Sequence, residues 1–247
     1  VDLTQGDPAG IGPELCLRVI RDPRVLALCL PVIVGDLAVL RQVAERLGLA
    51  LPERVVSPEA FLKDRIVSGP AALVDCKVAA GKIEPGVATR IAGEASYRYI
   101  ELATQAAVVG LIGGIATAPI TKTTLKLAGV VEPGHTEILG RLTACENFAM
   151  MLYSPRLAVS LVTCHQSLAS VPGDLKTDDI LRVIELTART REKIRGRDPR
   201  IAVLGLNPHA GEDGMFGREE IEIVAPAVER ARAAGRQVEG PIPPDAA

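Results

Sequence analysis

Five apolar runs, separated by amphipathic stretches, dominate the pattern of hydrophobic and polar positions along the chain. The runs show no alternation of apolar and polar residues, so they predict strands that are covered on both faces. They span residues 30–34, 71–75, 114–118, 158–163 and 201–206. Apolar residues in the intervening stretches recur with the helical period and predict helices over residues 13–21, 37–47, 93–110, 177–195 and 219–234. Because strand and helix alternate, we predict an α/β protein with a largely parallel sheet.

One uncharged stretch is long enough to cross a membrane. It covers residues 102–121, which contain no charged side chain. Gly113, Gly114 and Pro119 interrupt it, and most of its residues are small, so we interpret it as a helix that ends near Gly110 and a buried strand that follows. We therefore expect no membrane span. The start of the sequence also lacks the basic and apolar regions of a signal peptide.

Length and composition narrow the function classes. A chain of 247 residues can bury a sizeable core as one large domain or two small ones. Its net charge of -2 offers no basic field for nucleic acid, and an aromatic content of 2% without Trp offers few stacking platforms for single strands. We expect no nucleic-acid partner. Five cysteines without a CxxC pair argue against a disulfide framework or a zinc knuckle, so we expect a reducing, cytoplasmic location.

The three histidines all lie at strand exits or in loops, beside small residues. His165 follows the run 158–163 in TCHQS, His209 follows the run 201–206 in LNPHAGEDG, and His135 lies in GHTE. Ligands of open α/β sheets bind where strands end and loops begin. Neutral imidazoles brought there from separate strands are good ligands for a divalent metal. Each histidine alone also fits a surface or structural position, but together they predict a site.

Two other loops and one acidic residue are further candidates. Residues 6–14, GDPAGIGPE, match neither the dinucleotide fingerprint G-x-G-x-x-G nor a P-loop. Their backbone N–H groups either face an anion at a helix start or form a plain strand-to-helix turn. Lys122 either binds a substrate carboxylate or phosphate, acts as an acid after desolvation, or is a helix-start lysine in solvent. Asp245 is a candidate for orienting a ligand or accepting a proton.

Together these motifs resemble one enzyme family. They are GDPAGIGPE, API-x-K at 118–122, GHTE at 134–137, the histidine at 165 and LNPHAGEDG-x-x-G-x-EE at 206–220. In this order they are similar to the 4-hydroxythreonine-4-phosphate dehydrogenase family of pyridoxal 5'-phosphate biosynthesis. The resemblance implies an isocitrate and isopropylmalate dehydrogenase-like fold with two α/β subdomains and the active site in the cleft between them. We place the subdomains at 1–133, which a C-terminal segment completes in that family, and at 134–247, with the metal histidines and the dimer interface.

The resemblance also implies a reaction and roles for individual residues. In the family, a phosphorylated hydroxy acid loses a hydride to NAD or NADP, and the β-keto acid formed then loses CO2. A divalent metal (Zn, Mg, Mn or Co) is bound by three histidines, and His165 and His209 match the two that come from one subunit. His135 and Thr136 match the pair that contacts substrate. Lys122 is our candidate catalytic residue together with Asp245, and the resemblance implies a homodimer whose subunits share the active site.

Family members continue beyond PIPPDAA with YHDQG, which carries the third metal histidine, and with Lys, Asn and Arg groups that hold the substrate phosphate. We therefore interpret this sequence as a fragment, a truncated gene product, or a sequence restricted to ordered residues. Other readings stay open. The substrate is either the hydroxy amino acid or a related four-carbon acid such as phosphothreonate or phosphoerythronate. A phosphate acyltransferase of the same fold would not need the metal histidines, and an inactive remnant would bind neither metal nor NAD.

Overall fold

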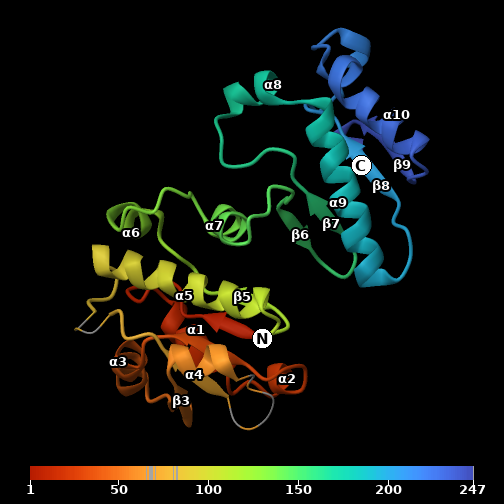
Figure 1. Cartoon of the computed structure of the whole chain (residues 1–247). Helices are drawn as coiled ribbons and strands as arrows, with labels where there is room; N and C mark the ends of the chain where they lie inside the picture. Colours follow the sequence, from red (N-terminus) through yellow and green to blue (C-terminus); the bar gives the residue numbers. More distant parts are fainter. Residues whose placement is uncertain (65, 67–68, 70, 80, 82, 247) are drawn as a thin grey trace. The chain divides into compact units, whose positions relative to one another are not determined.

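The computed structural model describes residues 1–64, 66, 69, 71–79, 81 and 83–246. The chain forms two compact units, Val1–Cys145 and Glu146–Ala247, called unit 1 and unit 2 below. Each unit combines strands with helices (Figure 1). The predicted α/β class is therefore confirmed.

Unit 1 is built on a five-stranded sheet in which all neighbouring strands are parallel. The strand order is β3-β4-β2-β1-β5. The strands are β1 (Asp2–Thr4), β2 (Val32–Gly35), β3 (Arg54–Val56), β4 (Ala72–Asp75) and β5 (Ile115–Thr117). Three of the predicted apolar runs thus form β2, β4 and β5. Because the strands are parallel, their carboxyl ends share one edge of the sheet, where the loops after β1 and β5 are neighbours.

Helices cover both faces of this sheet (Figure 1). Successive strand residues point to opposite faces, and apolar residues on each face pack against helices. Ile33 of β2 and Leu73 of β4 pack with residues of α1 and α3, whereas Val32 and Val34 pack with residues of α5. The helices of unit 1 are α1 (Gly12–Val19), α2 (Pro23–Leu26), α3 (Leu37–Leu47), α4 (Pro58–Lys63), α5 (Arg90–Val108), α6 (Lys122–Leu127) and α7 (His135–Leu142). The two buried clusters give the unit a core on each side of the sheet.

Helix α7 belongs to unit 1. The boundary between the units therefore lies later in the chain than the sequence analysis predicted. Ile138 of α7 is buried together with Ile100 of α5 and Leu125 of α6. The expected boundary at 133/134 lies directly before α7, and the observed one follows Cys145. The proline and glycine at 133 and 134 therefore lead into a helix that packs on unit 1, and they do not separate the units.

Unit 2 contains two small sheets and a pair of packed helices. Strands β6 (Met151–Tyr153) and β7 (Ala158–Ser160) are antiparallel, and β8 (Ile201–Leu204) and β9 (Val238–Ile242) are parallel. Helices α9 (Thr177–Arg195) and α10 (Ala225–Ala233) share a buried cluster with Val238 of β9. The other elements are η1 (Leu168–Ser170), α8 (Val171–Asp174), η2 (Glu212–Gly214), the π-helical turn η3 (Glu220–Val224) and η4 (Pro244–Ala246).

The run 158–163 differs from its prediction as a buried parallel strand. Only Ala158–Ser160 form a strand, which pairs with β6 in a hairpin and is partly exposed. The hairpin closes locally, since the N–H of Ser154 donates to the carbonyl of Leu157 at 2.8 Å. An apolar run alone does not distinguish a central parallel strand from one strand of a hairpin, and this is why the prediction was wrong.

Two predicted helices, α3 and α9, begin and end at the residues expected. Each is followed by a glycine in the left-handed conformation, Gly48 with φ 64° and Gly196 with φ 68°, which stops the helix. The uncharged stretch 102–121 divides as expected into the end of α5 and the strand β5. Among the described residues, no helix has the length and apolar character needed to span a membrane.

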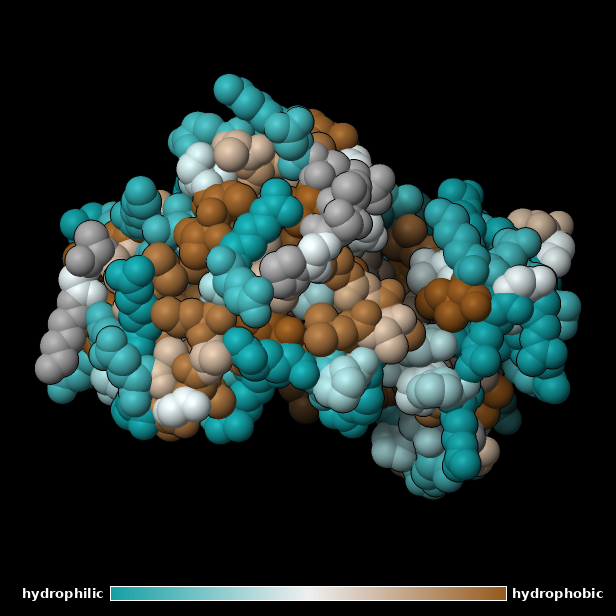
Figure 2. Space-filling view, turned by 90° about the horizontal axis from the view of Figure 1, so that it is seen from below, coloured by the Kyte–Doolittle hydropathy of each residue, from teal (hydrophilic) through white to brown (hydrophobic). Residues whose placement is uncertain are grey.

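The exposed surface carries many apolar side chains. Figure 2 shows apolar residues in patches between hydrophilic ones on the face that it draws. In unit 2 the β6–β7 hairpin contributes several of the exposed apolar or aromatic side chains, namely Leu152, Tyr153, Leu157 and Val159. A two-stranded hairpin is marginal by itself, and exposed apolar groups of this kind mark a surface suited to further packing.

Candidate functional site

The loop after β1 is fastened to the loop after β5. Gly6 has φ +70°, and a Cβ at this position would lie 2.4 Å from the carbonyl oxygen of Pro119, so only glycine permits the approach. The N–H of Asp7 donates to the same oxygen at 2.9 Å. The hydroxyl of Thr124 donates to Oδ2 of Asp7 at 3.1 Å, and the N–H of Ala9 donates to Oδ1 at 2.9 Å. These contacts give the start of GDPAGIGPE a structural role, because they join two strand-exit loops.

Lys122 is exposed at the start of α6, on the loop that Asp7 holds in place. Thr124, two positions further into the same turn, is buried and contacts Asp7. Lys122 therefore follows the carboxyl end of β5, on a backbone that the contacts of Asp7 with Pro119 and Thr124 hold in place. This location fits both the binding of an anionic substrate group and a solvated lysine at a helix start.

His135 and Thr136 are the first two residues of α7, and both are half-buried. Gly134 is the N-cap, and Glu137 occupies the third helical position, with Oε2 only 3.4 Å from where a Cβ on Gly134 would lie. The motif GHTE is therefore a helix start in which the glutamate folds back toward the cap. Burial lowers the pKa of His135, and its Nε2 has no hydrogen-bond partner among the described residues. The imidazole is thus held neutral at neutral pH.

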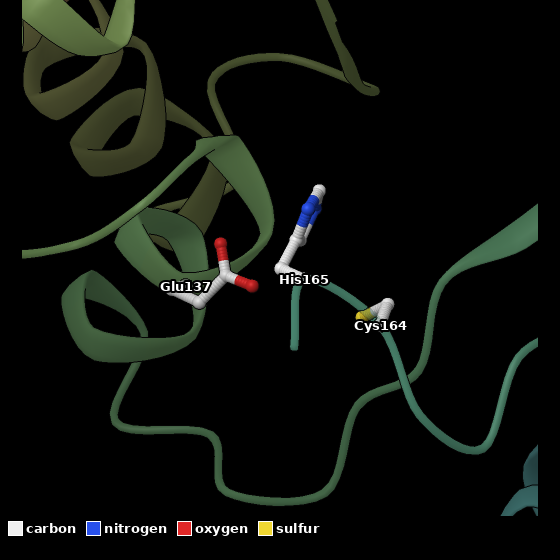
Figure 3. A group of neighbouring side chains, drawn as sticks. All are labelled: Glu137, Cys164 and His165. Atoms are coloured by element: carbon white, nitrogen blue, oxygen red, sulfur yellow. The ribbon is translucent and has the colours of Figure 1, made fainter. Parts of the chain in front are cut away.

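His165 lies in the loop between β7 and η1, with φ 59°, a conformation that few residues other than glycine adopt. Its side chain is exposed. The next residue, Gln166, anchors the loop because its amide donates to the Ser170 hydroxyl at 3.1 Å and to Oδ2 of Asp174 at 3.0 Å. Figure 3 draws His165 and Cys164 on this loop of unit 2, and Glu137 on α7 of unit 1.

His209 lies in the loop between β8 and η2, and its N–H is held by a side chain of the same loop. Oδ1 of Asn207 accepts the N–H of His209 and that of Gly211, both at 3.0 Å. An asparagine that bonds the backbone beyond itself fixes a tight turn. In the sequence Asn-Pro-His, the asparagine side chain therefore fixes the backbone conformation of the loop that carries the imidazole.

The ring of His209 has a carboxylate and an aromatic ring as neighbours. Its Nδ1 lies 3.3 Å from Oε2 of Glu212, and its ring centroid lies 6.0 Å from that of Phe216. About 63% of the His209 side chain is exposed. A carboxylate at Nδ1 is the partner that orients many metal-binding histidines, and it leaves Nε2 as the ligand atom.

The predicted residues divide between the two units. Lys122, His135 and Thr136 belong to unit 1, and His165, His209 and Asp245 belong to unit 2. Asp245 is exposed in η4 near the end of the chain, where the structure gives it no partner among the described residues. The described part of unit 2 holds by itself no group of three His, Cys, Asp or Glu ligand atoms within 4.8 Å of one another.

Sequence reasoning missed Glu220, the buried carboxylate beside the His209 loop. Glu220 is 2% exposed, and its Oε1 accepts the N–H of Leu206 at 2.8 Å. The signal available was the pair Glu219-Glu220 at the end of the 206–220 motif. Two glutamates at a helix start are ordinarily a solvated pair, so burial of the second one is visible only in the structure.

Comparison with known proteins decides the family. Residues 27–247 match the family described as Pyridoxal phosphate biosynthetic protein PdxA. The chain belongs to this PdxA family. The resemblance seen in the motifs is therefore confirmed, and the PdxA match extends well beyond those motifs.

Individual relatives agree with the family. The chain is 39% identical over 246 residues to a 4-hydroxythreonine-4-phosphate dehydrogenase of Trichlorobacter lovleyi, covering 99% of this chain and 73% of that protein. It is 40% identical over 258 residues to a D-threonate 4-phosphate dehydrogenase of Pectobacterium atrosepticum, covering 99% and 75%. A crystal structure of 4-hydroxythreonine-4-phosphate dehydrogenase from Klebsiella pneumoniae has a TM-score of 0.85 at 38% identity and covers 99% and 74%. The chain thus spans about three quarters of the length of these relatives, and the isocitrate and isopropylmalate dehydrogenase-like fold of PdxA proteins is confirmed.

Proposed function

We propose that the protein is an oxidoreductase that oxidises the CH–OH group of a phosphorylated four-carbon hydroxy acid, with NAD or NADP as hydride acceptor and with decarboxylation. The observation that carries the proposal is the identity of 39% and 40%, along 99% of the chain, to two relatives that are both named dehydrogenases. Their named substrates are 4-hydroxythreonine 4-phosphate and D-threonate 4-phosphate. We therefore propose the chemical class that these two share, a phosphate on a short hydroxy acid.

We propose His165 and His209 as two ligands of a divalent metal, one of Zn, Mg, Mn or Co. Both side chains are exposed on loops that follow strands of unit 2, and the imidazole of His209 is oriented through Nδ1 by Glu212. Imidazole nitrogens suit Zn2+ best among these ions, and a carboxylate behind His209 is a common partner of a metal-binding histidine. When bound, the ion lowers the pKa of the substrate hydroxyl and stabilises the charge that develops on its oxygen. The third ligand comes from outside unit 2.

We propose that side chains of unit 1 bind and orient the substrate. His135 is held neutral by its half-buried position at the start of α7, so it donates or accepts a hydrogen bond without adding charge. Thr136 beside it offers a hydroxyl. Lys122 supplies a positive charge for the carboxylate or phosphate, on a loop that Asp7 and Thr124 fix to its neighbour. Asp245, exposed in η4, is the candidate for accepting a proton.

The nicotinamide cofactor would accept the hydride that leaves the carbinol carbon. Residues 6–14 depart from the dinucleotide fingerprint, and Gly6 and Asp7 join two loops. We propose no residue of this chain as a dinucleotide contact. We also propose a homodimer in the cytoplasm, with the exposed apolar side chains of the β6–β7 hairpin as part of the interface.

The experiment that tests the function follows NADH absorbance. The protein is mixed with NAD or NADP, with 4-hydroxythreonine 4-phosphate or D-threonate 4-phosphate, and with Zn2+, Mg2+, Mn2+ or Co2+ in turn. We expect turnover with one of the two substrates, and loss of at least about 100-fold in His165→Ala and His209→Ala because each removes a metal ligand. The control is Arg200→Ala, which removes an exposed ion pair with Glu239. Absence of turnover with every combination, or full activity of His209→Ala, would contradict the proposal.

A further inference from the structure

We propose that Glu220 is a positioning residue for His209: its buried carboxylate fixes the backbone after β8 and so sets the direction of the imidazole. The proposal rests on the proposed function, in which His209 binds the metal. Glu220 does not touch the imidazole. It acts through the main chain of the loop, and the steps of this connection are contacts within unit 2.

The first step joins the carboxylate to the end of β8. Oε1 of Glu220 accepts the N–H of Leu206 at 2.8 Å and the N–H of Asn207 at 3.3 Å. The two donors lie two and three positions after the strand, which ends at Leu204. A single carboxylate oxygen thus binds two successive N–H groups, an arrangement that fixes the path of the chain as it leaves the sheet.

The second step joins Asn207 to His209. The backbone of Asn207 is held by Glu220, and its side-chain Oδ1 accepts the N–H groups of His209 and Gly211 at 3.0 Å. The side-chain amide of Asn207 also donates to the carbonyl of Phe216 at 3.4 Å. Glu220, Asn207 and His209 therefore form a continuous chain of hydrogen bonds from a buried anion to the proposed ligand.

The carboxylate is packed so closely that two glycines are required around it. A Cβ on Gly205 would lie 3.1 Å from Oε1, and also 2.9 Å from the Cβ of Ala210. A Cβ on Gly211 would lie 2.8 Å from Oε2, and Gly211 has φ +79°. The backbone on both sides of the loop thus contacts Glu220 directly, and side chains at either position would push it away.

The loop that this carboxylate holds has an unfavourable conformation. Ala210, Glu212 and Asp213 have φ of 49°, 44° and 52°, so three residues other than glycine lie in the left-handed region within four positions of His209. Such residues are conformationally strained and persist only where the surroundings determine their backbone. Glu220 also begins a π-helical turn, a feature that is rare and concentrated at functional sites.

Burial of this carboxylate is itself costly, and this argues for a role beyond packing. Glu220 is 2% exposed, and its Oε2 has no hydrogen-bond partner among the described residues. Burying a polar oxygen without a hydrogen-bond partner costs free energy relative to leaving it in water. This fits a role in orienting the loop, because Oε1 accepts the backbone N–H groups of Leu206 and Asn207.

The test compares Glu220→Leu, Glu220→Gln and Glu222→Gln in the whole chain. Glu222 is the matched control, because it is exposed on the same helical turn and pairs with Arg218. The readouts are the affinity for Zn2+ by titration calorimetry and the hydrogen exchange of the backbone amides of residues 206–211. We expect Glu220→Leu to weaken Zn2+ binding about 10- to 100-fold and to speed exchange at His209 and Gly211. Glu220→Gln keeps an oxygen acceptor and should restore most of the affinity, while Glu222→Gln should behave as the parent.

The outcomes separate this proposal from the proposed function. If His209→Ala leaves Zn2+ binding unchanged, the metal role of His209 fails, and the exchange data alone decide whether Glu220 orders the loop. If His209→Ala weakens binding but Glu220→Leu does not, the positioning role is overturned. Should Glu220→Leu fail to fold, Asn207→Ala replaces it, because this change keeps the buried carboxylate and removes the bond to His209. Parent-like Zn2+ affinity in Asn207→Ala would equally overturn the proposal.

Discussion

The phenol of Tyr99 on α5 donates a hydrogen bond of 2.9 Å to Oδ2 of Asp36, at the end of β2. Asp36 is buried and also accepts the N–H groups of Val78 and Ala79, which follow β4. Its own N–H donates to Oε1 of Gln5 at 2.7 Å. One carboxylate therefore links helix α5 to the ends of two strands, on the face of the sheet opposite α1 and α3.

Tyr99→Phe should destabilise unit 1 by about 1–3 kcal/mol, because it leaves the ring in place and removes a hydrogen bond to a buried charged group. The measurement is urea-induced unfolding at neutral pH. Tyr97→Phe is the control, since the Tyr97 hydroxyl accepts a bond from Arg141 in a more exposed position. If both changes lower the free energy of unfolding equally, the hydrogen bond from Tyr99 to Asp36 stabilises the unit no more than an exposed one does.

Asp2 should make the folded state less stable as the pH rises toward neutrality. Burial raises the pKa of Asp2 from 3.8 to about 7, and both carboxylate oxygens lack hydrogen-bond partners among the described residues. When the pKa of a carboxyl group is higher in the folded than in the unfolded state, the folded state binds the proton more tightly. The free energy of unfolding is therefore highest in acid and falls as the pH rises from 3.8 to about 7. Asp2→Asn should recover up to about 4 kcal/mol at pH values above that range.

The measurement is the free energy of unfolding against pH for both proteins. The fall between acid and neutral pH should be flatter in Asp2→Asn than in the parent. Asp22→Asn is the control, because Asp22 is an N-cap whose pKa is lowered to about 2 by Arg24, so it titrates below this range. A parent and an Asp2→Asn variant with parallel curves would show that Asp2 keeps an ordinary pKa.

Glu212→Gln should weaken Zn2+ binding about tenfold if His209 is a metal ligand. The carboxylate that lies 3.3 Å from Nδ1 orients the ring, and a neutral amide does this less well. Asp213→Asn removes the same charge from the next position, where no contact with His209 is observed. If Glu212→Gln and Asp213→Asn lose the same Zn2+ affinity, the effect comes from the overall charge of the loop and not from the contact with His209.

Gly6→Ala should destabilise unit 1 by clearly more than Gly48→Ala. Both glycines have a positive φ, 70° and 64°, so both changes carry a conformational cost of about 1 kcal/mol. Only at Gly6 does the added Cβ collide with the Pro119 carbonyl, whereas nothing lies within 4 Å at Gly48. The difference between the two free energies of unfolding therefore measures the contact between the β1 and β5 loops, and a difference near zero would mean that this contact relaxes easily.

Much of the fold of unit 1 was predictable from the sequence because buried parallel strands are continuous apolar runs. The runs that became β2, β4 and β5 were found in this way. Strands β3, β6 and β9 were missed because they are short or contain polar and Pro residues. Their pairing depends on neighbours that are distant in sequence, and local pattern does not carry that information.

The candidate site was predictable only in part. The histidines stood out because a strand exit beside small residues is a recognisable context, and the structure places His165 and His209 in loops after β7 and β8. The buried network behind His209 was not predictable, since Glu220 reads as a polar residue on an amphipathic helix. Its burial results from the approach of Gly205 and Gly211, which only the folded chain reveals.

The left-handed backbone at Ala210, Glu212 and Asp213 has a consequence for protein engineering. Glycine at these three positions would relieve local strain, so selection for heat resistance alone is expected to enrich it there. The same replacements would allow the loop more backbone conformations and would lower the population of the conformation that exposes the His209 imidazole. Under the proposed function, selection for thermostability would favour glycine at these positions, and selection for metal binding by His209 would disfavour it.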